Sequence, residues 1–303
     1  MNNKQRVING ILGAIVGDAM GVPYEFKDRT EIKSILKGEM VSDERRGLPK
    51  GTWSDDSSMI LCTVESLNTH GTNMKAMGNT FIKWYDKNHW TPHGRVFDIG
   101  STTRNAMDNI KLGFYINGAE EMDKGNGSLM RILPLACYLH DKDASEIKET
   151  IENCSALTHS TKECKIACVW YSLIVTSLMN TRTLNMSTVL FIAEKAIMSL
   201  YSREELRPFS RILSDEVLYL TPDELNGSGY VVHSLEVIIN CLFNSINFRD
   251  AILRAISIGF DTDTNASLVG GLVGLRHEIS QDLIDDLVRK EDILELLEKI
   301  NWI

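Results

Sequence analysis

Carboxylates and hydroxyls gather in two turns of the sequence, each directly ahead of an apolar segment with helical spacing. The first turn is GTWSDDS at residues 51–57, and the second is GFDTDTN at residues 259–265. Their candidate ligand side chains are Ser54, Asp55, Asp56, Asp261, Asp263 and Thr264. These oxygen atoms are hard ligands, which suit Mg²⁺, Mn²⁺ or Ca²⁺ better than Zn²⁺. Because Ser and Asp are also preferred at helix N-termini, simple capping remains the alternative for each turn.

The second turn also invites comparison with a calcium-binding EF-hand loop. Its side chains follow the spacing Asp261-x-Asp263-x-Asn265. An EF-hand needs glycine at position six and glutamate at position twelve, whereas this chain has Ala266 and Leu272 there. The EF-hand is therefore rejected, and what remains is a turn that leads acids into a helix of small residues.

A further acid, Glu25, follows the small-residue segment at 13–24. Glycines in a helix allow close packing against neighbouring backbones, and an unpaired carboxylate in such a setting is costly. We therefore expect a cation near Glu25. Asp18, within the same segment, is either an acid bonded to backbone at a helix end or a direct participant in the site.

The segment GNGSLMR at residues 125–131 places two glycines and a serine ahead of apolar residues. Exposed backbone donors at a helix N-terminus bind anions, so this segment is a candidate phosphate site, with an ordinary turn as the alternative. It is not a Walker loop, because GxxxxGK[ST] is absent. His159, ahead of another helical segment, is either a neighbour of the helix cap or a ring stacked on a substrate base.

His140-Asp141 is similar to the His-Asp pair of helical metal-dependent phosphohydrolases. The pair falls where a predicted helix ends, so a loop with a following helix cap is the competing explanation.

Apolar residues recur at helical spacing along most of the chain, and two-residue alternation is scarce. Only six prolines occur in 303 residues, which also favours helix. The predicted helices cover residues 4–17, 56–69, 73–88, 101–112, 128–139, 144–154, 161–180, 187–201, 203–214, 229–244, 248–258, 264–279 and 281–299, the last broken near Arg289. No joint between them has the composition of an interdomain linker, so we predict one compact all-α domain spanning residues 1–303.

The composition excludes several classes of function. Thirty-two basic against 41 acidic residues give a net charge of −9, so no basic surface for nucleic acid is expected. Six cysteines without a CxxC motif are expected to be reduced core thiols of a cytoplasmic protein. We expect no stretch to supply the ~20 apolar residues of a membrane span, so no membrane association is predicted.

Taken together and in chain order, these groups resemble the ADP-ribosylglycohydrolase family. The matching blocks are residues 13–25, 51–57, Asp98-Ile99-Gly100 with Thr102-Thr103, residues 126–131, Thr158-His159 and residues 259–271. The resemblance implies a single all-α domain with a binuclear site for two Mg²⁺ or Mn²⁺ ions in a cleft. It departs from the usual pattern at Phe260, where glycine is common, at Ser54, where threonine is common, and at residues 160–162.

The resemblance also implies roles for individual residues. Glu25 and Asp55 would be catalytic, and Glu25 would handle the proton. The metal ligands would be Ser54, Asp55, Asp56, Asp261, Asp263 and Thr264. The substrate contacts would be Asp98 and Gly100 at the distal ribose, Asn126, Gly127, Ser128 and Met130 at the diphosphate and neighbouring ribose, and His159 near the ligand.

The implied activity is hydrolysis of the C1″ N- or O-glycosidic bond of an ADP-ribosylated protein, preferably arginine-linked, or of a small ADP-ribosyl substrate. Free ADP-ribose would be released, and the protein is expected to be a monomer. Two alternatives remain: a non-catalytic member of the same fold that binds ADP-ribose or serves a structural role, and the His-Asp phosphohydrolase.

Overall fold

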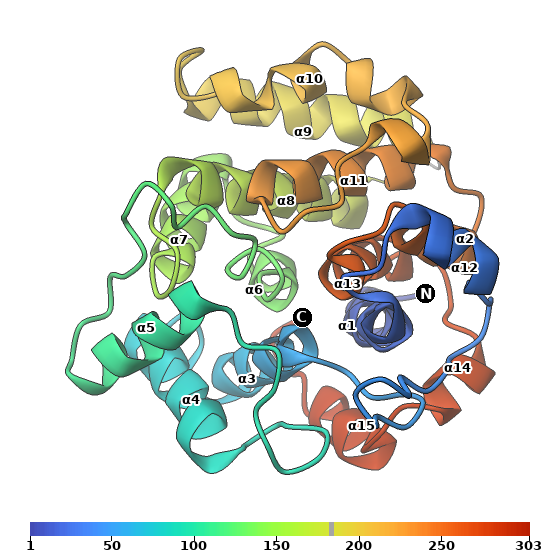
Figure 1. Ribbon diagram of the computed structural model, residues 1–303. Helices are drawn as coiled ribbons and strands as arrows, with labels where there is room; N and C mark the ends of the chain where they lie inside the picture. Colours follow the sequence, from blue (N-terminus) through green and yellow to red (C-terminus); the bar gives the residue numbers. More distant parts are fainter. Residues whose placement is uncertain (182–184) are drawn as a thin grey trace.

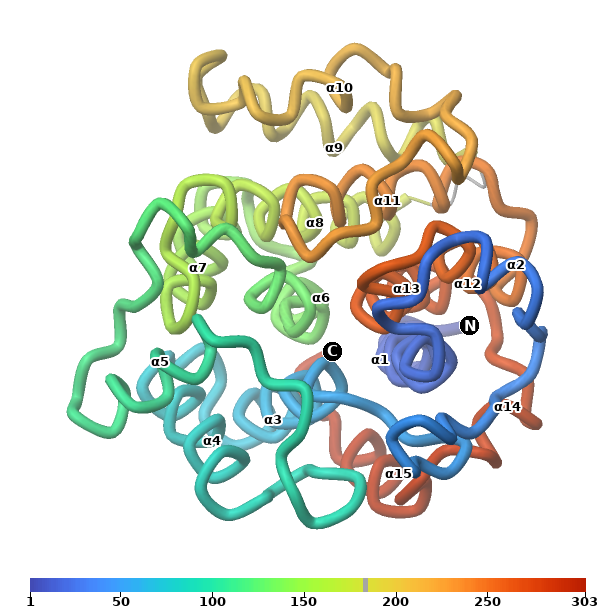
Figure 2. The backbone as a smooth tube through the Cα atoms, viewed as in Figure 1, coloured from blue at the N-terminus to red at the C-terminus, as the bar shows by residue number. Residues whose placement is uncertain are grey.

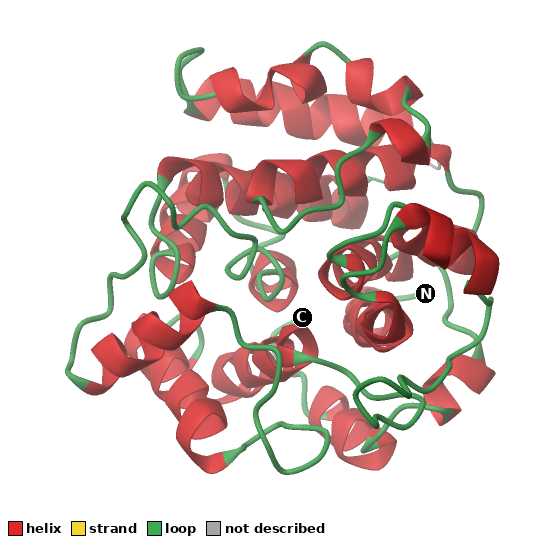
Figure 3. Cartoon of the chain, in the orientation of Figure 1, coloured by secondary structure: helices red, strands yellow, loops and turns green. Residues whose placement is uncertain are grey.

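The computed structural model describes residues 1–181 and 185–303, and within these ranges the chain is built from helices joined by loops (Figures 1 and 3). Its α-helices are α1 Asn3–Gly21, α2 Arg29–Ile35, α3 Asp55–His70, α4 Met74–Lys87, α5 Ser101–Lys111, α6 Leu133–Tyr138, α7 Ala144–Ser155, α8 Lys162–Asn180, α9 Met186–Leu200, α10 Ser210–Leu213, α11 Val231–Asn244, α12 Phe248–Ser257, α13 Thr262–Gly274, α14 Gln281–Asp285 and α15 Lys290–Glu298. Short 3-10 turns are η1 Val22–Tyr24, η2 Arg207–Phe209, η3 Glu216–Tyr219 and η4 Pro222–Glu224. The predicted all-α class is confirmed.

Helix starts follow the capping chemistry of the sequence. Many helices begin after an Asn, Asp or Ser whose side-chain oxygen accepts a hydrogen bond from a backbone N–H of the first turn, which would otherwise lack a partner. Examples are Asn2 before α1, Ser54 before α3, Asp143 before α7 and Asn247 before α12.

The centre of the molecule is the pair formed by α1 and α13, which share the most extensive helix–helix contact (Figure 2). Glycines allow this contact, because their backbones touch where other residues would hold them apart. A Cβ placed on Gly17 would lie 2.2 Å from the carbonyl oxygen of Ala266, and one on Gly270 would lie 2.2 Å from that of Gly13. The pair therefore brings the C-terminal end of α1 beside the N-terminal end of α13, although the two segments are far apart in sequence.

The other helices enclose this pair. α12 and α11 pack against α13, whereas α3 packs against α4, and α8 packs against α6, α7, α9 and α11. α9 and α10 form the outermost layer at the top of Figure 1. Large side chains fill the interior, and Trp53, Trp84 and Trp170 are fully buried.

Two predicted helices were wrong, and both errors were at prolines. The helix predicted at 128–139 begins only at Leu133, with Pro134 in its first turn. The helix predicted at 203–214 is reduced to η2, again with proline at its start, and the single turn of α10. Proline has no backbone N–H and clashes with the preceding turn, so it is tolerated at a helix start and not in its interior.

Two other details concern shorter helices. α2, capped by Asp28, was not predicted. The predicted break near Arg289 is confirmed, because this residue adopts a left-handed conformation with φ of 58° between α14 and α15.

The N-terminal segment Asn3–Tyr24 is long and apolar enough to cross a membrane, with a mean hydropathy of 1.3, contrary to the prediction that no stretch would be. Within the folded chain 94% of this window is buried. Its apolar side chains therefore belong to the core around α1 and α13.

Candidate functional site

The first acidic turn closes onto the start of α3 and is held there by Asp18. Ser54 is the N-cap, and its Oγ accepts a hydrogen bond from the backbone N–H of Asp56 at 3.2 Å. The carboxylate of Asp18 accepts hydrogen bonds from the backbone N–H groups of Ser54 and Ser57, each at 3.0 Å, and from the Ser57 hydroxyl. Asp18 therefore fixes the start of α3 by binding its backbone N–H groups, which is the first of the two interpretations given for this residue. Ser54 acts in part as a helix cap.

Capping does not explain the second turn. Asp261 occupies the N-cap position of α13 but makes no capping hydrogen bond. Its Oδ2 instead accepts a hydrogen bond from the side-chain amide of Asn126 at 2.7 Å. Thr264 donates a hydrogen bond to Oδ2 of Asp56 at 3.2 Å, which joins the two helix starts directly.

The acids from the two turns meet with acids from the α1 end and from the loop before α5. One carboxylate oxygen from each of Asp18, Asp56 and Asp263 lies within 4.8 Å of the other two. Glu25, Asp98 and Asp263 form a second group of the same kind. Asp263 belongs to both groups, so the two potential cation positions adjoin.

Electrostatics show how unfavourable this arrangement is without a cation. Burial, and then repulsion from neighbouring acids, raises the pKa values of Asp55, Asp56 and Asp263 well above their usual range. Oδ1 of Asp56 and Oδ1 of Asp263 are buried and have no hydrogen-bond partner. Buried carboxylate oxygens without partners are costly, and hard divalent cations are the natural partners for oxygen ligands. The residues present therefore fit a divalent metal.

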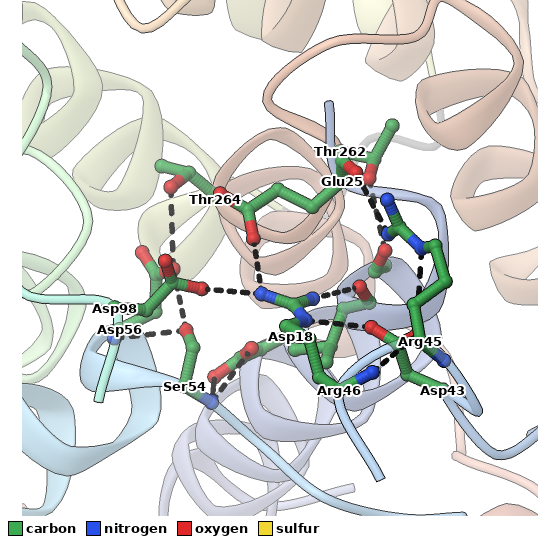
Figure 4. A network of polar contacts seen from close by, with 12 residues as sticks. Asp18, Glu25, Asp43, Arg45, Arg46, Ser54, Asp56, Asp98, Thr262 and Thr264 are labelled. Carbon is green, nitrogen blue, oxygen red and sulfur yellow. Dashed lines mark hydrogen bonds and ion pairs between the residues drawn. The ribbon is translucent and has the colours of Figure 1, made fainter. Parts of the chain in front are cut away.

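The cation expected near Glu25 is Arg46, at the centre of the polar network in Figure 4. Its Nη1 lies 2.7 Å from Oε2 of Glu25 and 3.1 Å from Oδ2 of Asp98, and its Nε lies 2.6 Å from Oδ2 of Asp43. Arg46 also donates to the carbonyl of Val22. Sequence reasoning did not identify Arg46, because its loop carries no signal that places it beside residues far away in the chain.

Glu25 is 4% exposed, and burial together with its contact to Asp98 raises its pKa despite the hydrogen bond and the charge of Arg46. A carboxyl group whose pKa is raised in this way can hold a proton near neutral pH and release it. That property suits an acid–base role.

These groups line one cleft of about 320 Å³. Its walls contain most of the predicted site residues, namely Glu25, Asp55, Asp98, Gly100, Asn126, Gly127, Met130, His159, Asp261, Asp263 and Thr264. Ser54 and Asp56 are buried behind this wall, and Phe26 and Met122 also line the cleft.

Ser128 is the predicted substrate residue that does not line the cleft. It is fully buried, and its hydroxyl accepts a hydrogen bond from Ser155 at 2.9 Å. The segment before α6 is also a set of turns rather than the helix start we predicted, with the N–H of Met130 donating to the carbonyl of Asn126 at 3.0 Å. Ser128 anchors these turns from behind.

His159 is 3% exposed, and its ring lies against the 125–127 turn. A Cβ on Gly127 would come within 2.8 Å of its Cε1, so glycine is needed there for the ring to fit. The N-cap of α8 is Thr161, two residues after His159. His159 therefore does not cap this helix, and its ring lines the cleft instead.

The backbone is strained near the cleft. Phe26, Asp98 and Phe260 all have positive φ, at 60°, 64° and 65°. The N–H of Phe26 donates to the carbonyl of Phe260 at 2.7 Å, and the N–H of Phe260 donates to the carbonyl of Lys27 at 3.1 Å. Non-glycine residues rarely adopt this conformation, and such strain is typical of functional sites.

The His140-Asp141 pair lies outside this site. Nδ1 of His140 lies 3.0 Å from the carbonyl oxygen of Cys137, the residue three positions earlier, and Asp141 is exposed. In the described part of the chain, neither residue belongs to a group that could hold a metal. The geometry therefore gives no support to the His-Asp interpretation.

Comparison with known proteins gives the same family as the sequence motifs. The model of the ADP-ribosylglycohydrolase family matches residues 1–301. The chain is 30% identical over 300 residues to an ADP-ribosylarginine hydrolase Tri1 of Serratia proteamaculans, covering 96% of this chain and 77% of that protein. It is 25% identical over 280 residues to the ADP-ribosyl-[dinitrogen reductase] glycohydrolase of Rhodospirillum rubrum, covering 90% and 86%.

A solved structure, described as an ADP-ribosylglycohydrolase-related protein complex, has the same fold. It superposes with a TM-score of 0.81 at 22% identity, covering 98% of this chain and 97% of the other.

Proposed function

Because the chain belongs to the ADP-ribosylglycohydrolase family, whose members hydrolyse glycosidic bonds, we propose that it removes ADP-ribose from arginine side chains of modified proteins in a divalent-metal-dependent reaction. The observation that carries the proposal is the pair of acidic groups sharing Asp263 in the wall of a cleft. The arginine linkage is supported by the Tri1 relatives, which are 30% identical to this chain and are named ADP-ribosylarginine hydrolases.

We propose that the acidic wall of the cleft holds two Mg²⁺ or Mn²⁺ ions, and that Asp56 and Asp263 are the members of the two acidic groups that bind them directly. Ser54, Asp55, Asp56, Asp261, Asp263 and Thr264 would be the ligands. Bound divalent ions would orient the hydroxyls of the distal ribose and lower the pKa of water held beside it.

The chain's own residues have distinct tasks in this reaction. Asp98 and Gly100 border the part of the cleft that would hold the distal ribose, and the 125–130 turns would hold the diphosphate. Asn126 ties these turns to the acids through its hydrogen bond to Asp261, so the diphosphate and the ribose are held in a fixed relation.

Glu25 is the proton carrier of the proposal. Water adds to C1″ as the bond from C1″ to the arginine nitrogen breaks through an oxocarbenium-like state, and the water proton ends on the departing nitrogen. Glu25 takes the proton from water at its carboxylate and passes it to the departing nitrogen, while Arg46 holds the carboxylate in the cleft at 2.7 Å. The products are ADP-ribose and unmodified arginine.

A non-catalytic ADP-ribose-binding protein is the remaining rival. That hypothesis predicts missing ligands, whereas all six proposed ligands and Glu25 are present. A cytoplasmic location and a monomeric state remain part of our proposal; the six cysteines are all buried and unpaired, as expected for reduced thiols.

The test measures free ADP-ribose released from arginine-linked, serine-linked and nucleic-acid-linked substrates, with Mg²⁺ or Mn²⁺ and with excess EDTA. We expect release from the arginine-linked substrate only with metal, and loss of at least about 100-fold in Asp55→Asn. Asp141→Asn is the matched control, because this exposed aspartate lies outside the site. Full activity in EDTA or in the Asp55→Ala, Asp263→Ala double variant would refute the metal-dependent reaction. Tight ADP-ribose binding without turnover would favour the rival.

A further inference from the structure

Arg131 is a buried cation without an acidic partner. The side chain is fully buried, and none of the salt bridges in the described chain includes it. Its Nη atoms contact Cys154 and Thr158, its guanidinium lies 4.6 Å from the centroid of the Phe81 ring, and its Nε has no partner. A buried charge that is neither paired nor fully hydrogen-bonded is expensive, so its presence calls for a functional explanation.

The hydrogen bond from Arg131 to Thr158 determines the direction of the hydrogen bond between Thr158 and His159. Nη2 of Arg131 lies 2.8 Å from Oγ1 of Thr158, and Nδ1 of His159 lies 2.9 Å from the same oxygen. A guanidinium can only donate, so Thr158 accepts from Arg131. Thr158 is fully buried, and within the described residues its hydroxyl has Nδ1 of His159 as its available acceptor. The hydroxyl therefore donates to Nδ1, and the ring proton of His159 lies on Nε2.

Nε2 of His159 faces the proposed diphosphate turns. It would lie 3.3 Å from a Cβ on Gly127 and 3.6 Å from one on Gly125, and His159 lines the cleft. No residue in the described chain accepts a hydrogen bond from Nε2. Burial, and then the charge of Arg131, lowers the pKa of His159 to about 3, so the ring stays neutral at physiological pH.

We propose that Arg131 and Thr158 are positioning residues that fix the proton of His159 on Nε2, so that this atom donates a hydrogen bond to a phosphate oxygen of the bound ADP-ribosyl group. The buried charge of Arg131 also provides a positive field behind turns that must attract a dianion in a protein of net charge −9. The identity of the ligand rests on the proposed function, whereas the position of the proton does not.

The first test is ¹⁵N NMR of the histidine rings in the full-length, metal-free protein, with His159 assigned by the signal lost in His159→Gln. We expect a proton on Nε2 and a bare Nδ1, unchanged between pH 5 and 8. Thr158→Ser should keep this pattern, because it keeps the hydroxyl. Thr158→Val, which is nearly the same size, should lose it. A proton on Nδ1 in the unmodified protein would overturn the inference.

The second test is calorimetry of ADP binding to the Mg²⁺-loaded protein, which requires no turnover. We expect Thr158→Val to bind ADP about tenfold more weakly, as the loss of one oriented hydrogen bond predicts, with Thr158→Ser close to the unmodified protein. Thr176→Val is the control, because the Thr176 hydroxyl is buried and has no partner. Unchanged ADP affinity in Thr158→Val would refute the proposal that Arg131 and Thr158 orient His159 for phosphate binding.

The two tests separate this inference from the proposed function. If the proton lies on Nε2 and ADP binding depends on Thr158, but no linkage is hydrolysed, the positioning role of Arg131 and Thr158 is supported and the proposed hydrolase activity is refuted. If the protein hydrolyses ADP-ribosylarginine but His159 carries its proton on Nδ1, the hydrolase activity is supported and the positioning role is refuted.

Discussion

Ionisable side chains in the cleft and beside it lie in places where charge is costly. Glu25 and Asp43 are 4% and 3% exposed, and both are paired with Arg46. A pair of this kind contributes little net stability, but removing one partner leaves the other buried and unpaired. The position of the Glu25 carboxylate, the proposed proton carrier, therefore depends on Arg46.

We predict that Arg46→Met lowers the free energy of unfolding by about 2–3 kcal/mol, because Glu25 loses its cationic partner and Asp43 keeps only the longer contact with Arg45. The same variant should lower kcat for ADP-ribose release by at least tenfold, since Glu25 is no longer held. Urea unfolding and steady-state kinetics measure the two effects. Arg45→Met is the neighbouring control: Arg45 is half exposed, its Nε lies 3.5 Å from Asp43, and its loss should cost under about 1 kcal/mol. Equal effects of the two variants would contradict the assignment.

At the scale of elements, the site depends on how closely α1 and α13 approach. Gly13, Gly17 and Gly21 on α1 face the backbone of α13, and the carbonyl of Gly21 accepts a hydrogen bond from Thr262 at 2.9 Å. The crossing places Asp18 and Asp263 in one group of acids. Small residues in these helices are therefore part of the site's construction as well as of the core.

Gly17→Ala tests this crossing. A Cβ at this position would lie 2.2 Å from the carbonyl oxygen of Ala266, a backbone atom that cannot swing aside. We expect the free energy of unfolding to fall by about 2–3 kcal/mol, in spite of the better helix propensity of alanine. Gly38→Ala is the matched control, because the nearest heavy atom there, Cδ of Arg249, is 3.6 Å away. The interpretation fails if the two variants unfold at the same urea concentration.

At the scale of the whole molecule, the acids come from segments near both ends of the chain and meet only in the folded state. Burial raises the pKa of Asp18 from its ordinary value of 3.8 to about 6, and burial with mutual repulsion raises those of Asp55 and Asp263 further. These site acids therefore bind more protons in the folded chain than in the unfolded chain above pH 4. Stability from these groups is present below the unfolded pKa and is lost as pH rises through the folded values.

We predict that Mg²⁺ raises the Tm more at pH 8 than at pH 5, by about 5 °C, because the metal replaces protons that the acids release over this range. The readout is the difference in Tm between Mg²⁺ and EDTA at each pH, which cancels titrations outside the site. Asp263→Asn should abolish most of this difference, and Asp141→Asn should retain it. A Mg²⁺ effect that is independent of pH would contradict the predicted linkage.

The helical class and most element positions were readable from the sequence, because apolar periodicity and capping residues act within a few positions of the chain. The two wrongly predicted helices included Pro134 and Pro208 in their interiors. The exclusion of proline from helix interiors already contradicted the apolar periodicity at these positions. The acidic turns were also readable, because Asp and Ser before a helix form a short, local pattern.

Most helices, the ordered set of motifs and hence the candidate ligands could be predicted from the sequence, since each depends on neighbouring residues. The folded arrangement was needed to show that Arg46 pairs with Glu25, that Ser128 lies outside the cleft lining, and that Asp263 belongs to both acidic groups. The place of Asp263 beside Asp18 follows from the close contact of α1 and α13 at their glycines, which joins segments about 250 residues apart. Contacts of such range depend on the packing of the whole chain, and no local pattern encodes them.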